Sequence, residues 1–251
     1  MDLTTPTFDR VAVWQRTKMY YKDTPLKSSL VIHGFDEVKE PVPRYDSTQI
    51  MFANDDCIDV AIMYKRQGHK VLLLNMADWA FAGGLVDAGA GTQEEECFRR
   101  SDYFKHLHQS YYPLKSLDTI VSTGVEYGFH GQKQGYVQMD HPDTLDMIAA
   151  PALRYPDITG DHMFFKDPKD IQLFEDKIKM LLFAGRTTDA DTLILSAWGC
   201  GAFRCPVHHV AQIFRQVLSQ YGGLYETIVF AIHGPNFEWF KDSFEHAATS
   251  S

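Results

Sequence analysis

The most informative segment of this chain is Lys70-Val71-Leu72-Leu73-Leu74-Asn75, which is apolar almost throughout. A short, continuous apolar run is typical of a strand that is covered on both faces of a sheet. A glycine-rich stretch follows over residues 75–92, and the next pattern predicts a helix from Gln93 to about His108. A strand, a glycine-rich loop and a helix in this order favour an α/β domain whose ligand site lies at the carboxyl end of the strand.

The same alternation extends on both sides of this segment. Strands are predicted over residues 29–32, 49–52, 146–150, 192–196 and 227–231. Helices are predicted over residues 8–21 with Thr7 as N-cap, from an Asn54 cap through residues 59–64, and over residues 168–184, 206–221 and 237–246. Residues 111–138 show no regular pattern and are expected to form an irregular excursion. The alternation predicts one three-layer α/β/α unit with a mixed, largely parallel sheet, in which residues 1–48 extend a core over residues 49–251.

The composition excludes several classes of protein. Of the 251 residues, 45% are hydrophobic and 23% are charged, which suits a folded domain with a sizeable core. The formal charge of −9 argues against binding of a nucleic-acid backbone, although backbone N–H groups can still hold a phosphorylated ligand. No apolar run reaches the roughly 20 residues of a membrane helix, and the first residues lack the pattern of a signal peptide. We therefore expect a soluble, cytoplasmic monomer, with a nuclear location open if the source is eukaryotic.

The cysteines and histidines show no metal-binding pattern. The four cysteines, at positions 57, 97, 200 and 205, include no C-x-x-C pair, and the histidines include no H-E-x-x-H pair. Zinc sites commonly show spacings of these kinds. Neither a metal nor another cofactor is therefore expected, and the thiols are expected to be reduced.

Two glycine-bearing loops follow predicted strands, one over residues 75–92 and one over residues 197–203. Glycine lets a backbone approach a ligand closely and lets successive N–H groups line a hollow that binds anions. Tight turns and close packing explain such glycines equally well for either loop alone. Two such loops in one domain favour a phosphorylated ligand, although neither matches a P-loop or a full G-x-G-x-x-G motif.

Between the first loop and its helix the chain reads Gln93-Glu94-Glu95-Glu96. Acidic residues in a first helical turn complement the helix dipole, and Thr92 with Glu95 satisfies a capping box. Alternatively, one carboxylate faces the ligand loop and serves as a general acid in the cleavage of a glycosidic bond. The sequence leaves both interpretations open.

The combination of these motifs resembles the microbial-type poly(ADP-ribose) glycohydrolase catalytic domain, a macrodomain with an N-terminal extension. The resemblance rests on the strand that ends in Asn75, the glycine-rich loop, the Gln-Glu-Glu run and residues 149–152, 195–203 and 229–232. It covers roughly residues 50–240 together with the opening helix. It implies a macrodomain-like fold and a metal-independent glycosidase, which hydrolyses the ribose–ribose bond of ADP-ribose polymers on modified proteins.

The resemblance also implies roles for single residues. Glu95 would protonate the ribose oxygen of the scissile bond before water adds to the anomeric carbon, and Glu94 would orient the ligand. The implied ligand-binding residues are Asn75, Gly83, Gly84, Gln93, Gly199, Cys200, Gly201, Ala202 and Phe203. The chain departs from the family pattern at Leu85, which replaces the third glycine of a triplet, and at Ala82, where proline is usual.

Two other functions are compatible with the same motifs. One is a non-catalytic ADP-ribose reader, which Leu85 favours and the retained Glu94 and Glu95 disfavour. The other is a hydrolase of mono-ADP-ribosylated protein, nucleic acid or a small metabolite. Release of ADP-ribose from an automodified polymerase separates the reader from the enzymes, and product analysis with defined substrates separates the two enzymes.

Overall fold

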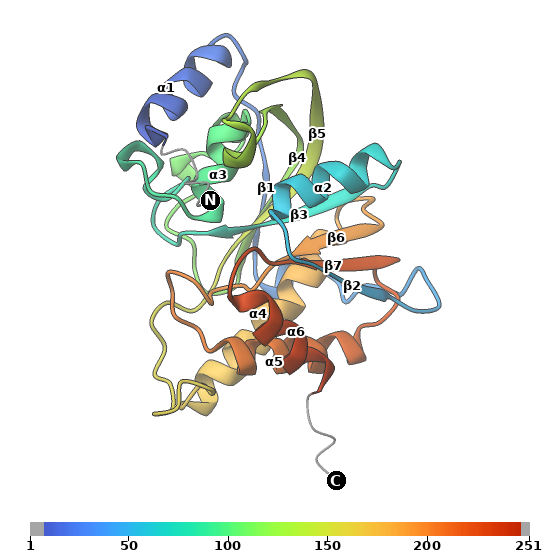
Figure 1. Cartoon of the computed structure of the whole chain (residues 1–251). Helices are drawn as coiled ribbons and strands as arrows, with labels where there is room; N and C mark the ends of the chain where they lie inside the picture. Colours follow the sequence, from blue (N-terminus) through green and yellow to red (C-terminus); the bar gives the residue numbers. More distant parts are fainter. Residues whose placement is uncertain (1–7, 247–251) are drawn as a thin grey trace.

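A seven-stranded sheet runs through the part of the chain that the computed structural model describes, residues 8–246 (Figure 1). The strands are β1 (Leu30–His33), β2 (Gln49–Ala53), β3 (Val71–Ala77), β4 (Asp118–Phe129), β5 (Gln138–Pro151), β6 (Thr192–Leu195) and β7 (Thr227–Ala231). The helices are α1 (Arg10–Tyr20), α2 (Cys57–Arg66), α3 (Gln93–Arg100), α4 (Pro168–Gly185), α5 (Val207–Gln220) and α6 (Asn236–Glu245).

Strand β3 lies in the middle of the sheet, whose order is β1-β4-β5-β3-β6-β7-β2. It is parallel to both of its neighbours, β5 and β6, and the parallel pairing continues through β7 to β2. The other edge is antiparallel, because β4 pairs in that sense with β5 and with β1. The predicted mixed, largely parallel sheet is confirmed, and β1, which lies within residues 1–48, is its edge strand.

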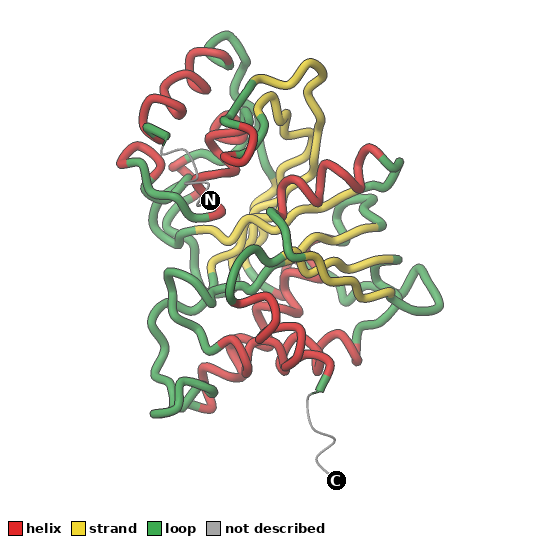
Figure 2. The backbone as a smooth tube through the Cα atoms, in the orientation of Figure 1, coloured by secondary structure: helices red, strands yellow, loops and turns green. Residues whose placement is uncertain are grey.

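Helices cover both faces of the sheet, as the side chains of β3 show. Leu72 and Leu74 belong to the apolar cluster that α4, α5 and α6 complete, whereas Leu73 belongs to the cluster that α2 and α3 complete. Successive strand side chains point to opposite faces, so a fully apolar strand is buried on both. Figure 2 shows these helices on the two sides of the strands, in the predicted three layers. Among the described residues, no helix combines the length and the apolar character needed to cross a bilayer.

Strand β4 was not predicted from the sequence. Residues 111–138 were expected to be irregular, but Asp118–Phe129 forms a long strand between β1 and β5. Its pairing with β5 shifts register between Ser122 and Val125, and Gly124 within that shift has φ of +65°. Bulges of this kind break the two-residue period by which a strand is identified in a sequence.

Helix α3 is shorter than predicted, because it ends at Arg100 instead of His108. Ser101 is extended and forms a β-bridge with Tyr127 of β4. The buried guanidinium of Arg100 donates to Asp56 at 3.0 Å and to Asp59, so it is tied to the start of α2. A tertiary bridge thus ends the helix, while residues 103–105 form a separate short 3₁₀ turn.

Two predicted helix caps were placed too early in the chain. Helix α1 is capped by Asp9, whose carboxylate accepts from the N–H groups of Val11 and Ala12 at 3.0 Å. The predicted cap Thr7 lies outside the described residues. Helix α2 is capped by Asp56, not by Asn54, and Asp56 accepts from two N–H groups of the first turn at 2.9 and 3.0 Å. Aspartate and asparagine cap almost equally well, so propensity alone did not distinguish neighbouring candidates.

Candidate active site

A cavity of about 450 Å³ opens at the carboxyl ends of β3, β5 and β6. Ligand sites of open α/β sheets lie at this edge, and the volume is in the range of small-molecule pockets. The lining residues are Met76, Asp78, Gly84, Leu85, Ala90, Thr92, Gln93, Glu94, Glu95, Arg154, Tyr155, Ala197, Gly199, Gly201, Ala202 and Phe203. Both predicted loops and the Gln-Glu-Glu run therefore meet in one cavity.

Glu94 ties the first loop to the end of β3. One of its carboxylate oxygens accepts from the Asp78 N–H at 2.7 Å, and the other accepts from the Gly83 N–H at 3.2 Å and from Asn75 Nδ2 at 3.3 Å. Burial raises the pKa of Glu94 to about 8, while the three N–H donors act in the opposite direction. With both oxygens held by the protein, Glu94 fixes the shape of the loop.

Glu95 acts as a helix cap and also faces the cavity. Its Oε2 accepts from the Thr92 N–H at 2.8 Å, which closes the predicted capping box, and also accepts from the Thr92 hydroxyl. Its Oε1 accepts from the Leu85 N–H at 3.0 Å, on the loop above the helix. Capping and a catalytic position are therefore compatible, because the cap uses one oxygen and leaves the other beside the ligand loop.

Gln93 connects α3 to the central strand. Its amide donates to the carbonyl of Leu74 at 2.7 Å and accepts from the N–H of Met76 at 2.8 Å. The parallel pairing of β3 with β6 ends at Leu73. Beyond that point, the side chain of Gln93 supplies hydrogen-bond partners for the backbone of β3 in place of the neighbouring strand. The start of α3 is thereby fixed to the strand end that carries the cavity.

The first loop needs glycine at two positions beside the glutamates. Gly83 has φ of +80°, and a Cβ there would lie 2.5 Å from the ring of Phe98. Gly84 has φ of +57°, and a Cβ there would lie 2.5 Å from Glu95 Oε1. Leu85, by contrast, has φ of −106°, which any residue adopts, and its side chain is 61% exposed beside the cavity. Of the two glycines, Gly84 lines the cavity whereas Gly83 is buried under the loop.

Two other glycines of this loop serve packing. A Cβ at Gly91 would lie 2.6 Å from the guanidinium carbon of Arg10, and Gly89 is in contact with the same helix, α1. The indole of Trp14 donates to Asp87 at 2.7 Å, which adds a polar tie between α1 and the loop. Gly89 also has φ of +78°, so a turn as well as packing accounts for these glycines, as the alternative interpretation of the sequence proposed. Helix α1 supports the loop from its outer side.

The second loop places its predicted residues in different surroundings. Gly199 has φ of +77°, and a Cβ there would lie 2.7 Å from Cys205 Sγ, whereas Gly201 does not have a positive φ and faces open space. The N–H groups of Gly201, Ala202 and Phe203 make no hydrogen bond to the described part of the chain. Three successive free donors on the cavity wall suit an anionic ligand.

Not every predicted residue lines the cavity. Asn75 is fully buried behind Glu94, to which it donates, and Cys200 is partly buried against the apolar core. Sequence reasoning missed Arg154 and Tyr155, which line the cavity from the loop after β5. The sequence did contain a signal for these two residues. Residues 149–152 were predicted to belong to a strand end and to the family motif, and the loops that follow neighbouring parallel strands meet at one edge of the sheet.

Within residues 8–246, no three His, Cys, Asp or Glu side chains form a group that could hold a metal ion. The polar groups that line the cavity include carboxylates, backbone N–H groups, Arg154 and the side chains of Thr92, Gln93 and Tyr155. Such a set can hold a diphosphate by its N–H groups and can deliver a proton from a carboxyl group.

Comparison with known proteins agrees with this geometry. Residues 8–123 match the family model described as "Microbial-type PARG, catalytic domain", where PARG denotes poly(ADP-ribose) glycohydrolase. The resemblance seen in the sequence is confirmed. A search of curated protein sequences finds no match.

Solved microbial PARG structures share the fold over nearly the whole chain. The enzyme from Thermomonospora curvata superposes with a TM-score of 0.77 at 20% identity and covers 94% of this chain and 99% of its own. The same enzyme bound to the inhibitor ADP-HPD gives 0.71 at 18% identity, covering 96% of this chain and 99% of its own. The enzyme from Deinococcus radiodurans in complex with ADP-ribose gives 0.68 at 19% identity, covering 96% and 91%. The macrodomain-like PARG fold is therefore established.

Proposed function

We propose that this chain is a poly(ADP-ribose) glycohydrolase, which hydrolyses the ribose–ribose glycosidic bond of ADP-ribose polymers and releases ADP-ribose. The observation that carries the proposal is the position of Glu95, whose carboxylate lies in a ligand-sized cavity between two glycine-bearing loops. The match to the microbial PARG family model over residues 8–123, and the bound ADP-ribose and inhibitor in the related structures, support the same substrate class.

In this proposal the second loop binds the diphosphate. The free N–H groups of Gly201, Ala202 and Phe203 donate to its oxygens, and the Phe203 ring packs against the distal ribose. Gly84 lets the backbone of the first loop approach the same ribose. The anomeric carbon of that ribose then lies beside Glu95.

The chemical step needs one proton and one water. Glu95 in its protonated form gives its proton to the bridging oxygen, and the bond between that oxygen and the anomeric carbon breaks. The resulting carboxylate stabilises the oxocarbenium-like centre, water adds to the anomeric carbon, and its proton returns to Glu95. Glu94 takes no part in these proton transfers and holds the loop by accepting hydrogen bonds from three N–H groups.

Substitution Glu95→Gln tests the proposal. We expect kcat to fall by about 10² or more, with ADP-ribose affinity within a few-fold of wild type, because the acid acts in the transition state. The variant should also lose about 1–3 kcal/mol of stability, since one of the Leu85 and Thr92 N–H groups then faces an amide NH₂.

A matched control separates this stability loss from catalysis. Asp167 caps α4 by accepting from the Lys169 N–H at 2.9 Å and does not line the cavity. Asp167→Ala should cost about 1 kcal/mol and keep wild-type turnover. Wild-type turnover in Glu95→Gln would return Glu95 to a capping role alone.

The exposed side chain of Leu85 at the cavity favours a second candidate function. That function is either a non-catalytic ADP-ribose reader or a mono-ADP-ribosyl hydrolase. In this second candidate function, the bulk of Leu85 excludes the second ribose of a polymer from the cavity. Products from polymer and from mono-ADP-ribosylated protein, resolved by chromatography, distinguish these functions. Our proposal extends to a monomer that acts in the cytoplasm, where the four free cysteines remain reduced.

A further inference from the structure

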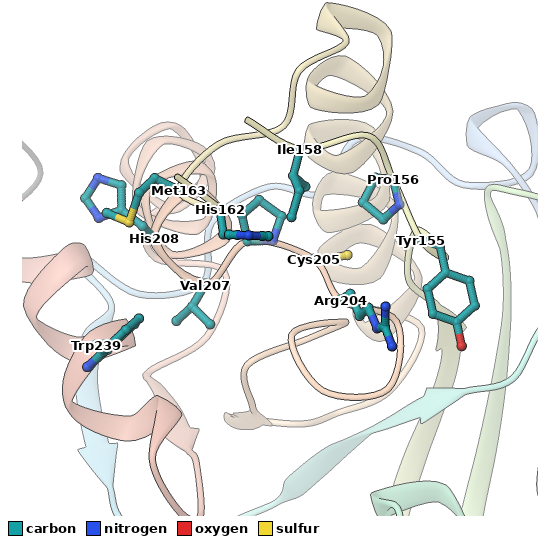
Figure 3. Close-up of a pocket in the computed structure, with 11 residues that line it drawn as sticks. Tyr155, Pro156, Ile158, His162, Met163, Arg204, Cys205, Val207, His208 and Trp239 are labelled. Carbon is teal, nitrogen blue, oxygen red and sulfur yellow. The ribbon is translucent and has the colours of Figure 1, made fainter. Parts of the chain in front are cut away.

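A second cavity, of about 490 Å³, borders the one that holds Glu94 and Glu95. It lies between the loop after β5, the start of α5 and a residue of α6, and Figure 3 shows its lining side chains. Tyr155 lines both cavities, so they lie next to each other at this residue. The lining contains no Asp or Glu, although the chain as a whole carries a formal charge of −9. A phosphorylated ligand meets no carboxylate on these walls.

The second cavity has aromatic rings at its ends and a cation beside one of them. Figure 3 shows Tyr155 and Arg204 at one end and Trp239 at the other. The side chains of Tyr155 and Trp239 are 55% and 66% exposed. The guanidinium carbons of Arg154 and Arg204 lie 5.3 and 5.7 Å from the centroid of the Tyr155 ring. Exposed aromatic rings stack on nucleobases, and arginine pairs with phosphate.

The walls of this cavity are held in an uncommon backbone conformation. Within residues 8–246, four non-glycine residues have positive φ, and three of them line this cavity: Tyr155, His162 and Arg204, at 51°, 62° and 60°. A positive φ is strained for a residue with a side chain, and such strain persists where the surroundings impose it.

Hydrogen bonds anchor this wall to the rest of the protein at two places. The Tyr155 N–H donates to the carbonyl of Phe203 at 2.9 Å, which joins the loop after β5 to the second loop of the first cavity. Further along, the Phe165 N–H donates to His209 Nδ1 at 3.0 Å, and burial lowers the pKa of His209, which keeps that nitrogen an acceptor. The wall is therefore anchored both to the first cavity and to α5.

We propose that the second cavity binds the adjoining ADP-ribose unit of the polymer, a second nucleoside diphosphate covalently joined to the unit in the first cavity. Its adenine stacks on Trp239, and its diphosphate pairs with Arg204. Covalently linked units can occupy both sites only if the sites are adjacent, and Tyr155 borders both cavities. The inference rests on the proposed function, because it assumes that the first cavity holds one ADP-ribose unit.

The test compares ADP-ribose with its covalent dimer by calorimetry, in the Glu95→Gln background that does not cleave the dimer. The dimer should bind more tightly than ADP-ribose. Trp239→Ala and Arg204→Gln should each weaken dimer binding at least about fivefold, the scale of one lost stacking or ionic contact, and leave ADP-ribose binding within about twofold. The control Lys241→Gln removes one positive charge from α6 outside the cavity lining and should change neither affinity.

The outcomes distinguish this inference from the proposed function. If ADP-ribose binds but the dimer binds no more tightly, or if both substitutions weaken the two ligands equally, the adjoining-unit site is refuted and the proposed function stands. A properly folded protein that fails to bind ADP-ribose refutes the proposed function and, with it, the inference. Equal loss of dimer affinity in Lys241→Gln would also refute the site, because general charge would then explain the effect.

Discussion

Gly84→Ala is the most direct test of the geometry around Glu95. A Cβ at this position would lie 2.5 Å from Glu95 Oε1 and 3.3 Å from Glu94 Oε2. Oε1 must therefore move by about 0.9 Å to reach the 3.4 Å of an ordinary contact. That movement strains the hydrogen bond which Oε1 accepts from the Leu85 N–H at 3.0 Å. The substitution thus displaces the proposed acid without changing its chemistry.

Gly84→Ala should lower the rate of hydrolysis strongly and the free energy of unfolding only slightly. Misplacement of a catalytic group by about 1 Å lowers the rate by about 10², so we expect turnover on polymer to fall to that extent. Gly84 has φ of +57°, and alanine in this region costs roughly 1–2 kcal/mol. Single-turnover release of ADP-ribose measures the first effect, and urea denaturation followed by circular dichroism measures the second.

Gly124→Ala provides the matched control. Gly124 has φ of +65°, and no atom lies within 4 Å of the position that a Cβ would take there, so the substitution brings the same backbone cost without the contact. Both variants should lose similar free energy of unfolding, and only Gly84→Ala should lose turnover. Wild-type turnover in a folded Gly84→Ala would refute the assignment of Glu95, and an equal loss in Gly124→Ala would attribute the effect to general destabilisation.

Three further predictions follow from the cavity. Leu85→Gly should raise turnover on polymer. It should lower the free energy of unfolding by about 1 kcal/mol or less, because the side chain is 61% exposed and its loss opens no buried cavity. Unimproved turnover would show that Leu85 does not restrict the site. Gly201→Val should weaken ADP-ribose binding at an unchanged melting temperature. Gly199→Val should lower the melting temperature, because its Cβ would lie 2.7 Å from Cys205 Sγ. If calorimetry shows unchanged affinity for ADP-ribose in Gly201→Val, the second loop is not part of the binding site. Hydrolysis should persist in excess chelator, and a loss of activity that added metal restores would contradict the proposed mechanism.

Much of the fold could be predicted from the sequence, because apolar periodicity and helix caps are properties of short segments. The apolar run of β3 indicates burial on both faces, and the fully buried strands β6 and β7 show the same apolar pattern. The capping box joins Thr92 to Glu95, three positions later in the chain, so it could also be predicted from the sequence. Helix α3 shows the limit of such signals, because its end depends on a bridge between Ser101 and Tyr127.

Only part of the site could be predicted from the sequence, because some of its residues come together through contacts between distant segments. The Gln-Glu-Glu run and the two loops have their own composition, and strand-to-loop order placed them at one edge of the sheet. Arg154 and Tyr155 lie in a loop without distinctive composition, so only their position after a predicted strand indicated them. They line the cavity because β5 pairs with β3, a contact between segments about 75 residues apart in the chain.

The amino-acid sequence by itself determined the class of fold, the central strand and the segment that carries the acids, since periodicity, caps and glycine content are properties of short segments. Tertiary structure decided which glycines serve the site: Gly84 lies against Glu95, whereas Gly91 lies against Arg10 of α1. It also decided that Glu95 caps its helix with one oxygen and faces the cavity with the other. A glycine or a carboxylate takes its role from what packs against it, and that partner is set by the order and register of strands distant in the chain.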